Sequence, residues 1–530
     1  MAPIIRTCSA LALLLAPTLA VANREPSALA LYVQARVADA ARAPDVAIPA
    51  YAAALSADPD NVKIASRAYR EAVNGGDFEL ALRAARTLER LGSTPPDARL
   101  LFYIAAIRAR DWNDARSRVT DLAEAPGFGF LAPLFDAWLP KPVTLLNTGA
   151  RQNAYQAENE ALLLLASGNH RAGTAAVKAL WALDPYRAGS LRIAAASLLA
   201  TKGRGAEGAA LIQAADMAAV QARAIVSRNG DTGLAVDSPA SATAFLLARV
   251  SGDLTVEGSG RSSLTIARLA EFAAPENARI RLNVAGALSA ARMPTPALAI
   301  ATALSTDPVY GEDAASLRIE LLERVGRVDE ALGEARARAD RSANDLARVG
   351  DIEMRRGSYA AAATIYEEFL REKGRGRETY ATLYAAANAH GNAGNWRAAR
   401  PLLERALVLA PDNPSILNEL GYSLIEQGID LPRGAALIAR AAELRPGDPA
   451  IIDSLGVAKL RSGAAGEAVK LLERAVRLDI GQAEIGEHLG DAYWAAGRRI
   501  DARYAWTAAR IQAEGAALAR LEHKIARGLP

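Results

Sequence analysis

Cysteine is almost absent from this chain of 530 residues, and its single copy, Cys8, lies near the N-terminus. Histidine is also scarce: His170, His390, His488 and His523 are far apart, and no His-Glu-x-x-His pattern or cysteine pair accompanies them. Zinc sites need several such ligands together, and nucleophilic catalysis needs a base beside its nucleophile. We therefore expect no metal site, no cofactor and no catalytic residues, and we interpret the histidines as exposed or half-packed side chains.

Phosphate-binding loops are lacking as well. No Gly-Lys-Ser/Thr sequence occurs, which excludes a P-loop. Gly203, Gly205 and Gly208 match Gly-x-Gly-x-x-Gly as text, but they follow LRIAAASLLATK, which has the composition of a helix. Because the dinucleotide motif must follow a strand, no nucleotide site is predicted here.

Aromatic residues make up only 5% of the chain although hydrophobic residues reach 51%, because alanine and leucine dominate. Such a composition favours closely packed helices over β-sheets. Neither sign of charge is in excess, since 62 basic and 59 acidic residues leave a net charge of +3. This balance does not indicate nucleic acid as a partner. Beyond the N-terminus no run of about 18 apolar residues occurs, so no transmembrane segment is predicted after signal cleavage.

The N-terminal sequence MAPIIRTCSALALLLAPTLAVAN has the pattern of a cleavable signal peptide. Arg6 precedes an apolar run over residues 8–19, and a small-residue cleavage pattern ends at Ala22. We expect cleavage after Ala22 and a periplasmic mature protein; the alternative is a retained N-terminal anchor. A lipoprotein cysteine lies at the cleavage point, after the apolar run, whereas Cys8 lies at the start of that run, so no outer-membrane lipid anchor is predicted.

A repeat of about 34 residues is clearest in the C-terminal third. Repeat frames begin at Tyr380, Pro414, Pro449 and Ala483, which lie 34, 35 and 34 residues apart. The same types of residue recur at the same places of each frame. The eighth place is small (Ala387, Gly421, Gly456, Gly490), the twenty-fourth is large and apolar (Leu403, Ile438, Leu472, Trp506), and the twenty-seventh is alanine (Ala406, Ala441, Ala475, Ala509). In the second frame, a one-residue insertion displaces the last two places by one.

Each recurring place has a packing role in a pair of antiparallel helices. The small residue on the first helix, helix A, allows the second helix, helix B, to approach closely, and the large residue fills the remaining space. The alanine late in helix B allows the next helix A to pack against it, and a following proline ends helix B. One pair alone cannot bury its apolar face, so successive pairs must stack.

Weaker copies of the pattern begin near Ala28, Ala154, Asn277 and Ala343. Residues 124–153 and 227–262 interrupt the rhythm, and we interpret them either as degenerate repeats with lengthened loops or as a joint or partner-contacting loop. Residues 517–526 are predicted as a last helix. Its polar outer face would carry Arg520, Glu522, His523 and Lys524.

These recurring places are those of the tetratricopeptide repeat (TPR), and the chain resembles that family. The resemblance implies an all-α fold, a right-handed superhelical solenoid of antiparallel helix pairs. The predicted organisation is a signal peptide (1–22), N-terminal TPR-like repeats (23–125), degenerate helical repeats with long loops (126–262), a C-terminal TPR array (263–516), and a capping helix with a tail (517–530).

In TPR proteins, a groove lined by successive helices A binds protein partners. Carried onto this chain, the resemblance implies a protein-binding groove lined by Tyr384, Asn388, Asn418, Tyr422, Ile425, Asp453, Glu487, Asp491 and Trp494. Tyr384 stands where chaperone-binding members carry a basic residue, so capture of a free C-terminal carboxylate by that clamp is not predicted. The acidic residues of the last two repeats favour a basic partner surface. The alternative for Tyr422 and Trp494 is that they pack within the array.

Two segments, LNELGYSLIEQGIDLPRGAALIARAAELRPGDPAIIDSLGVAKLRSG and IGEHLGDAYWAAGRRIDARYAW, are similar to exported bacterial TPR proteins, which are often outer-membrane lipoproteins. One member of that group is an adaptor that docks substrates onto a periplasmic carboxyl-terminal processing protease. The resemblance covers about residues 380–516, and the chain departs from the group in lacking the lipid-anchored cysteine.

The sequence therefore leads to one main functional hypothesis and two alternatives. The main hypothesis is a non-catalytic periplasmic TPR scaffold or adaptor that binds other proteins and presents substrates to an envelope protease. The first alternative is a structural or assembly factor that bridges cell-wall or outer-membrane complexes. The second is an enzyme with an unrecognised site in residues 124–262.

Overall fold

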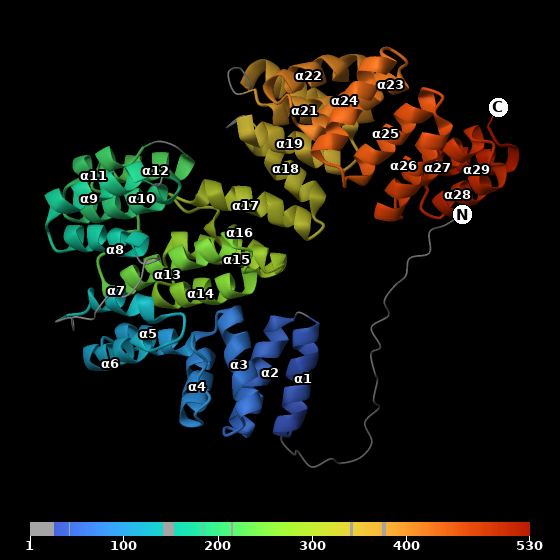
Figure 1. Ribbon diagram of the computed structural model, residues 1–530. Helices are drawn as coiled ribbons and strands as arrows, with labels where there is room; N and C mark the ends of the chain where they lie inside the picture. The colour runs from blue at the N-terminus through green and yellow to red at the C-terminus, as the bar shows by residue number, and fades with distance from the viewer. Residues whose placement is uncertain are drawn as a thin grey trace. The chain divides into compact units, whose positions relative to one another are not determined.

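The computed structural model describes residues 26–41, 43–140, 153–183, 185–213, 216–339, 343–373 and 378–529 (Figure 1). Every regular element in these segments is a helix, so the predicted all-α class is confirmed. The helices form two compact units, Met1–Val325 and Gly326–Pro530, and each is described by itself. The predicted signal peptide lies outside the described residues. No helix in the described segments has the length and apolarity that a membrane span requires.

The second unit is a series of helix pairs followed by a single helix. Its helices are α18 (Val328–Arg338), α19 (Ala343–Arg355), α20 (Tyr359–Glu368) with the π-helical turn η3 (Phe369–Lys373), α21 (Tyr380–Asn392), α22 (Trp396–Leu409), α23 (Pro414–Glu426), α24 (Leu431–Leu444), α25 (Pro449–Arg461), α26 (Ala465–Leu478), α27 (Ala483–Ala495), α28 (Arg499–Arg510) and α29 (Gly515–Arg527).

The four predicted repeat frames begin where the structure begins a helix. Helices α21, α23, α25 and α27 start at the first residues of the frames, and each packs against the helix that follows it. Each helix B then packs against the next helix A, from α22 on α23 to α26 on α27. The predicted antiparallel pairs and their stacking in sequence order are therefore confirmed in this unit.

Short polar and glycine signals set the ends of these helices. Asn413 and Asp448 accept hydrogen bonds from the first backbone N–H groups of α23 and α25, and Pro414 and Pro449 occupy the first helical position. The turn from helix A to helix B contains a glycine in the left-handed region, with φ between 62° and 82°, in all four repeats (Gly394, Gly428, Gly463, Gly497).

The small eighth place allows the close approach that the sequence predicts. A Cβ atom on Gly490 would lie 2.3 Å from the Trp506 ring, one on Gly456 2.6 Å from the Leu472 Cγ atom, and one on Gly421 2.7 Å from Ile438. The twenty-seventh place packs against the next repeat, since Ala441 shares a buried cluster with Ile451 and Ala475 shares one with Ile485. Both packing roles are therefore confirmed.

Helix α29 covers the end of the array. Leu521 is fully buried in a cluster with Ala502, Trp506 and Ala509 of α28. Lys524 does not lie on the outer face, as the sequence predicts, but turns back to contact acidic side chains of α27. The carboxylates of Glu487 and Asp491 attract this amine, which explains the difference.

The first unit begins and ends with helix pairs and has shorter elements between them. Its helices are α1 (Ala28–Ala40), α2 (Pro44–Ala57), α3 (Val62–Gly75), α4 (Phe78–Arg90), α5 (Ala98–Ala109), α6 (Trp112–Ala123), η1 (Gly129–Leu131), α7 (Ala132–Asp136), α8 (Asn153–Ala166), α9 (His170–Leu183), α10 (Pro185–Thr201), α11 (Gly205–Leu211), α12 (Met217–Val226), α13 (Pro239–Val256), α14 (Gly260–Ala273), α15 (Ala278–Ala290), α16 (Pro294–Leu304) and α17 (Gly311–Arg324).

Packing in the first unit does not follow sequence order alone. Helix α14 packs against α3 and α5, and α13 packs against α5, α7 and α8 (Figure 1). The Arg268 side chain donates to the Asn74 carbonyl (3.1 Å) and Arg108 donates to the Phe272 carbonyl (3.0 Å). One buried cluster therefore joins α1–α7 to α13–α15, while α8–α12 contribute to further clusters.

Candidate functional site

Four of the predicted binding residues keep partly open surface on two adjacent helices A of the second unit. Tyr384 and Asn388 lie one turn apart on α21, and Asn418 and Tyr422 lie one turn apart on α23. All four side chains are half-buried. The Tyr384 hydroxyl and the Asn388 side chain form a hydrogen bond with each other on α21.

The two tyrosines also contribute to packing. Tyr384 packs against the cluster that contains Leu403 and Leu420, and Tyr422 packs against the cluster that contains Ile438 and Val457. Burial is the main cause that raises the pKa of both hydroxyls, so both remain protonated donors at neutral pH. The two interpretations given to Tyr422, packing and surface contact, therefore describe different parts of one side chain.

Beside these residues, α23 carries polar groups without a partner. The Asn418 Oδ1 atom is buried and accepts no hydrogen bond. Burial raises the pKa of the neighbouring Glu419, and the charge of Glu484 on α27 raises it further. We call Asn418, Glu419, Tyr422 and Glu484 the α23 patch. Buried polar groups are normally paired, so an unpaired amide oxygen beside an uncompensated carboxylate requires an explanation.

The three predicted acidic residues, in contrast, are engaged by the chain itself. Asp453 is 7% exposed and lies 2.9 Å from the Nδ1 atom of His488. Glu487 is 6% exposed and contacts the Lys524 amine at 2.8 Å, and Asp491 contacts the same amine at 2.7 Å. Burial opposes ionisation of Glu487, but its bonds to Lys524 and Arg520 lower its pKa overall.

The remaining two predicted residues face the interior or the cap. Ile425 is 3% exposed, and a Cβ atom on Gly434 of α24 would lie 2.8 Å from it, so this side chain holds the helix pair together. Trp494 stacks near Trp506, with ring centroids 5.6 Å apart, and a Cβ atom on Gly528 would lie 2.1 Å from its ring.

The binding role of all nine residues stays a prediction. Six of them are half-buried, but Asp491 and Trp494 are engaged by the cap, which leaves the four residues on α21 and α23. Glu419, at helix-A place 6, and Glu484, at place 2, complete that surface, and neither is among the residues predicted from the sequence. Glu419 carries a signal of its own, since it is a charged residue between Leu417 and Leu420, both of which are core residues.

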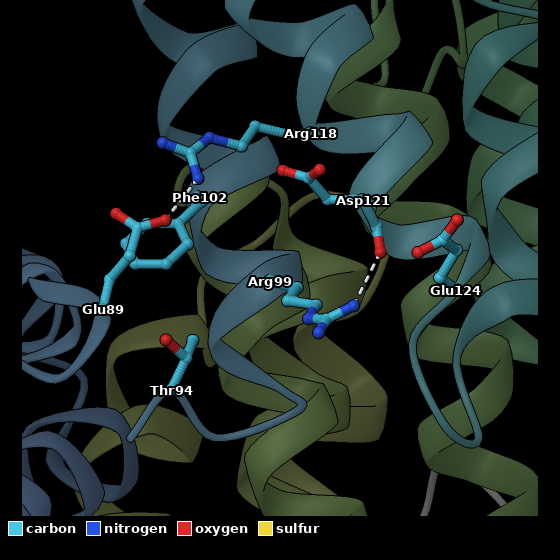
Figure 2. Close-up of a pocket in the computed structure, with 7 residues that line it drawn as sticks. All are labelled: Glu89, Thr94, Arg99, Phe102, Arg118, Asp121 and Glu124. Carbon is cyan, nitrogen blue, oxygen red and sulfur yellow. Dashed lines mark hydrogen bonds and ion pairs between the residues drawn. The ribbon is translucent and has the colours of Figure 1, made fainter. Parts of the chain in front are cut away.

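A separate cavity of about 230 Å³ lies in the first unit beside α5 and α6 (Figure 2). Arg118 contacts Glu89 at 2.6 Å and lies over the Phe102 ring, and Arg99 donates to the backbone carbonyl of Asp121 at 2.7 Å. Because both arginines are already engaged, we interpret this cavity as part of the contact between neighbouring helix pairs. The lining is completed by Thr94 and Glu124.

The described residues contain no group of three or more His, Cys, Asp or Glu side chains that could hold a metal ion. The histidines have separate surroundings. His390 lies 2.9 Å from Glu367, His488 bonds to Asp453, and His523 is exposed.

The Gly-x-Gly-x-x-Gly sequence has a packing explanation. It joins helix α10 to helix α11, and a Cβ atom on Gly205 would lie 2.1 Å from the Val226 carbonyl. A Cβ atom on Gly208 would lie 2.7 Å from the Ala196 carbonyl. The absence of a side chain at Gly205 and Gly208 thus permits α11 to pack between α10 and α12.

Comparison with protein families gives one match: residues 380–423 match the model described as Tetratricopeptide repeat. The match covers α21, α22 and most of α23, which carry four of the predicted binding residues. The first clear frame of the sequence is therefore a TPR. A search of curated proteins found no match.

Solved structures of helical-repeat proteins align with the chain at low similarity. A chain of the Cut9–Hcn1 hetero-tetramer of the APC/C aligns over 94% of this chain and 96% of its own, with 14% identity and a TM-score of 0.39. A thermophilic TPR protein of Thermus thermophilus aligns over 35% of this chain and 98% of its own, with 21% identity and a TM-score of 0.31. MamA of Desulfovibrio magneticus aligns over 32% of this chain and 94% of its own (19% identity, TM-score 0.28). At these scores, the fold assignment rests on the helix pairs themselves and on the repeat match.

Proposed function

We propose that this chain is a non-catalytic scaffold that binds other proteins at the α23 patch and the adjoining face of α21. The observation that carries the proposal is the pair of uncompensated polar groups at Asn418 and Glu419, which lie within reach of two half-buried tyrosines on a TPR helix-A face. A stacked helical array supplies a rigid surface of this kind without further elements.

The chemistry of the patch defines what it can bind. A lysine or arginine of the partner would neutralise Glu419 and Glu484, and a donor would satisfy the Asn418 oxygen if the side chain turns outward on binding. Tyr384 and Tyr422 offer large contact areas, and their side chains lose little conformational entropy on binding. A segment with a basic residue beside apolar or aromatic residues therefore fits best.

Site-specific photo-crosslinking tests the proposal. A photoreactive phenylalanine analogue would replace Tyr384 or Tyr422 in turn, and Lys470, which is exposed on the outer face of α26, would serve as the control position. We expect discrete protein adducts from the two helix-A positions and none from Lys470. Equal adducts at all three positions would contradict a binding surface on helix A.

The variant Glu419→Gln tests how much the charge of Glu419 contributes to partner binding. This change keeps the size of the side chain and removes its charge, so a basic partner should bind about tenfold more weakly or worse, the loss of one charge-assisted hydrogen bond. An unchanged adduct pattern and affinity would remove Glu419 from the site.

Localisation is a further part of the proposal. The N-terminal signal pattern supports a periplasmic protein, and N-terminal sequencing of the mature chain should read Asn23 first. A mature chain that retains Met1, or one that carries lipid, would contradict this.

Delivery of substrates to an envelope protease is the most specific form of the proposal, and it is supported by the sequence similarity of residues 380–516. Adducts at Tyr422 that contain a carboxyl-terminal processing protease or a cell-wall hydrolase would support it. Adducts that contain cell-wall synthesis or outer-membrane assembly proteins would support the bridging role instead.

A further inference from the structure

A second exposed surface lies on the outer face of α28, away from the helix-A face. Ile500, Tyr504 and Ile511 are 73%, 74% and 77% exposed. Their spacing places the three side chains within about 40° of one another around the helix axis. Ala502, Trp506 and Ala509 point to the opposite side, where they are buried under α29. The cap therefore covers one face of α28 and leaves a row of large apolar side chains on the other.

The other helices B of the same array show that this row is not required by the fold. At the corresponding places, α22 has Arg397, Pro401 and Val408, α24 has Pro432, Ala436 and Glu443, and α26 has Gly466, Lys470 and Arg477. Only α28 has large apolar residues at all three places. The neighbouring helices B pack in the same way without such a row, so folding does not require the apolar row of α28. An exposed row of large apolar side chains marks an interaction surface.

The charges beside the row are of one sign. Arg499, Arg503 and Arg510 follow one edge of it, and no carboxylate in the described segments pairs with any of them. Arg499 and Arg503 lie over the Trp494 ring, and Arg503 also donates to the Ile525 carbonyl. The acid near the other edge, Asp501, is already paired with Arg498 at 2.7 Å.

We infer that the outer face of α28 is a docking site for an amphipathic helix of another protein, with an apolar stripe flanked by Asp or Glu residues. A helix matches a straight row at spacings of four and seven residues, and the acidic flank would pair with the arginine edge, which has no carboxylate partner in the described segments. A second copy of this chain fits poorly, because α28 offers only Asp501 as an acid. A row one residue wide also offers a membrane surface little area to bury.

The test uses a synthetic helical peptide with leucine at positions i, i+4, i+7 and i+11 and glutamate along both flanks. A second peptide carries lysine in place of glutamate. Fluorescence anisotropy with the full chain should show binding of the glutamate peptide and at least about tenfold weaker binding of the lysine peptide. Binding of both peptides with equal affinity would overturn the charge match.

Matched variants locate the site. The triple change Ile500→Ser, Tyr504→Ser and Ile511→Ser should weaken binding of the glutamate peptide at least about tenfold. The control is Val408→Ser with Ile480→Ser, since these side chains are 82% and 86% exposed on other elements. This control should bind as the wild type does. Equal loss in both variants would overturn the proposal.

Arg510→Glu is the cleanest charge variant, because Arg510 does not contact the cap residue Trp494. It should weaken binding of the glutamate peptide and strengthen binding of the lysine peptide.

Two further measurements distinguish the proposed helix from other molecules that could bind this face. Concentration-dependent self-association that the triple variant abolishes would assign the face to a second copy and overturn the proposal. Binding to phosphatidylglycerol vesicles without peptide binding would assign it to lipid and would also overturn it.

Discussion

At the scale of single residues, the Cβ atom at the eighth place, by its presence or absence, decides how closely helices A and B of a repeat can pack. Gly490 has no Cβ atom, and this allows Trp506, which is fully buried, to lie against the backbone of α27. The Trp506 ring cannot easily move away, because its Nε1 atom donates to the Asp491 carboxylate at 2.9 Å and Trp494 lies beside it.

Gly490→Ala should therefore destabilise the second unit by about 1–3 kcal/mol through overpacking. The measurement is urea or thermal unfolding of the full chain. Gly333→Ala is the matched control: Gly333 lies inside α18, and a Cβ atom there would meet nothing within 4 Å. This control should raise stability by up to about 1 kcal/mol, because alanine has the higher helix propensity. A neutral Gly490→Ala would show that the Trp506 contact is not tight.

The eighth-place residues could be predicted from the sequence because their role is local to one repeat. The contact that Asp453 makes could not be predicted in this way. Its partner, His488, is 35 residues away, and only the register between α25 and α27 brings the two side chains together. The same limit applies to Asp491, whose partner Lys524 lies 33 residues further on in α29, and to Glu487, which contacts the same lysine.

At the scale of elements, α25 and α27 are joined by a contact that depends on pH. Burial lowers the pKa of His488, but the hydrogen bond and charge of Asp453, with added charge from Glu484 and Asp491, raise it overall. A histidine whose pKa is raised on folding stabilises the folded state fully below its unfolded pKa of about 6.5. That contribution is lost as the pH rises through the folded pKa.

His488→Gln should remove this dependence. Between about pH 6 and pH 9, the melting temperature of the wild type should fall more steeply than that of the variant, since glutamine has no charge to lose. His523→Gln, at an exposed position of α29, should follow the wild type. Parallel curves for the wild type and His488→Gln would show that His488 is not charged in the folded protein.

In the second unit, helix boundaries could be predicted well from the sequence, because Asn or Asp before proline marks where a helix A begins. They could be predicted less well between residues 124 and 262. There some elements are too short for a periodic pattern, since α7 has five residues and α11 only the seven residues Gly205–Leu211. Packing against distant helices, rather than local propensity, holds such elements.

At the scale of the whole molecule, α29 takes the place of the helix A that a further repeat would supply. The Lys524 side chain is 16% exposed and lies between the carboxylates of Glu487 and Asp491. Lys524→Met should cost about 3 kcal/mol, because Asp491 loses its paired cation and Glu487 keeps only the largely exposed Arg520.

Hydrogen exchange of the α29 amides provides the measurement for Lys524→Met, and they should exchange faster together with those of α28. His523→Met, on the exposed side of α29, is the control. Adding Glu487→Gln and Asp491→Asn to Lys524→Met should recover part of the loss, since no unpaired charge remains. If this combined variant is less stable than Lys524→Met alone, charge pairing is not what holds the cap.

The two units also differ in when their cores can be completed. In the second unit, the side-chain contacts between repeats join residues no more than about 35 positions apart, as in the contact of Asp453 with His488. In the first unit, Arg268 reaches back 194 positions to Asn74, and Arg108 meets Phe272 across 164. Contacts of long sequence separation form late, because a large loop must close first. A chain that emerges from a ribosome or a secretion channel N-terminus first must therefore leave α3 and α5 without their partners until α14 has followed. Over that interval the apolar surface that α14 will cover stays open to solvent, while the later repeats can fold pair by pair as they appear.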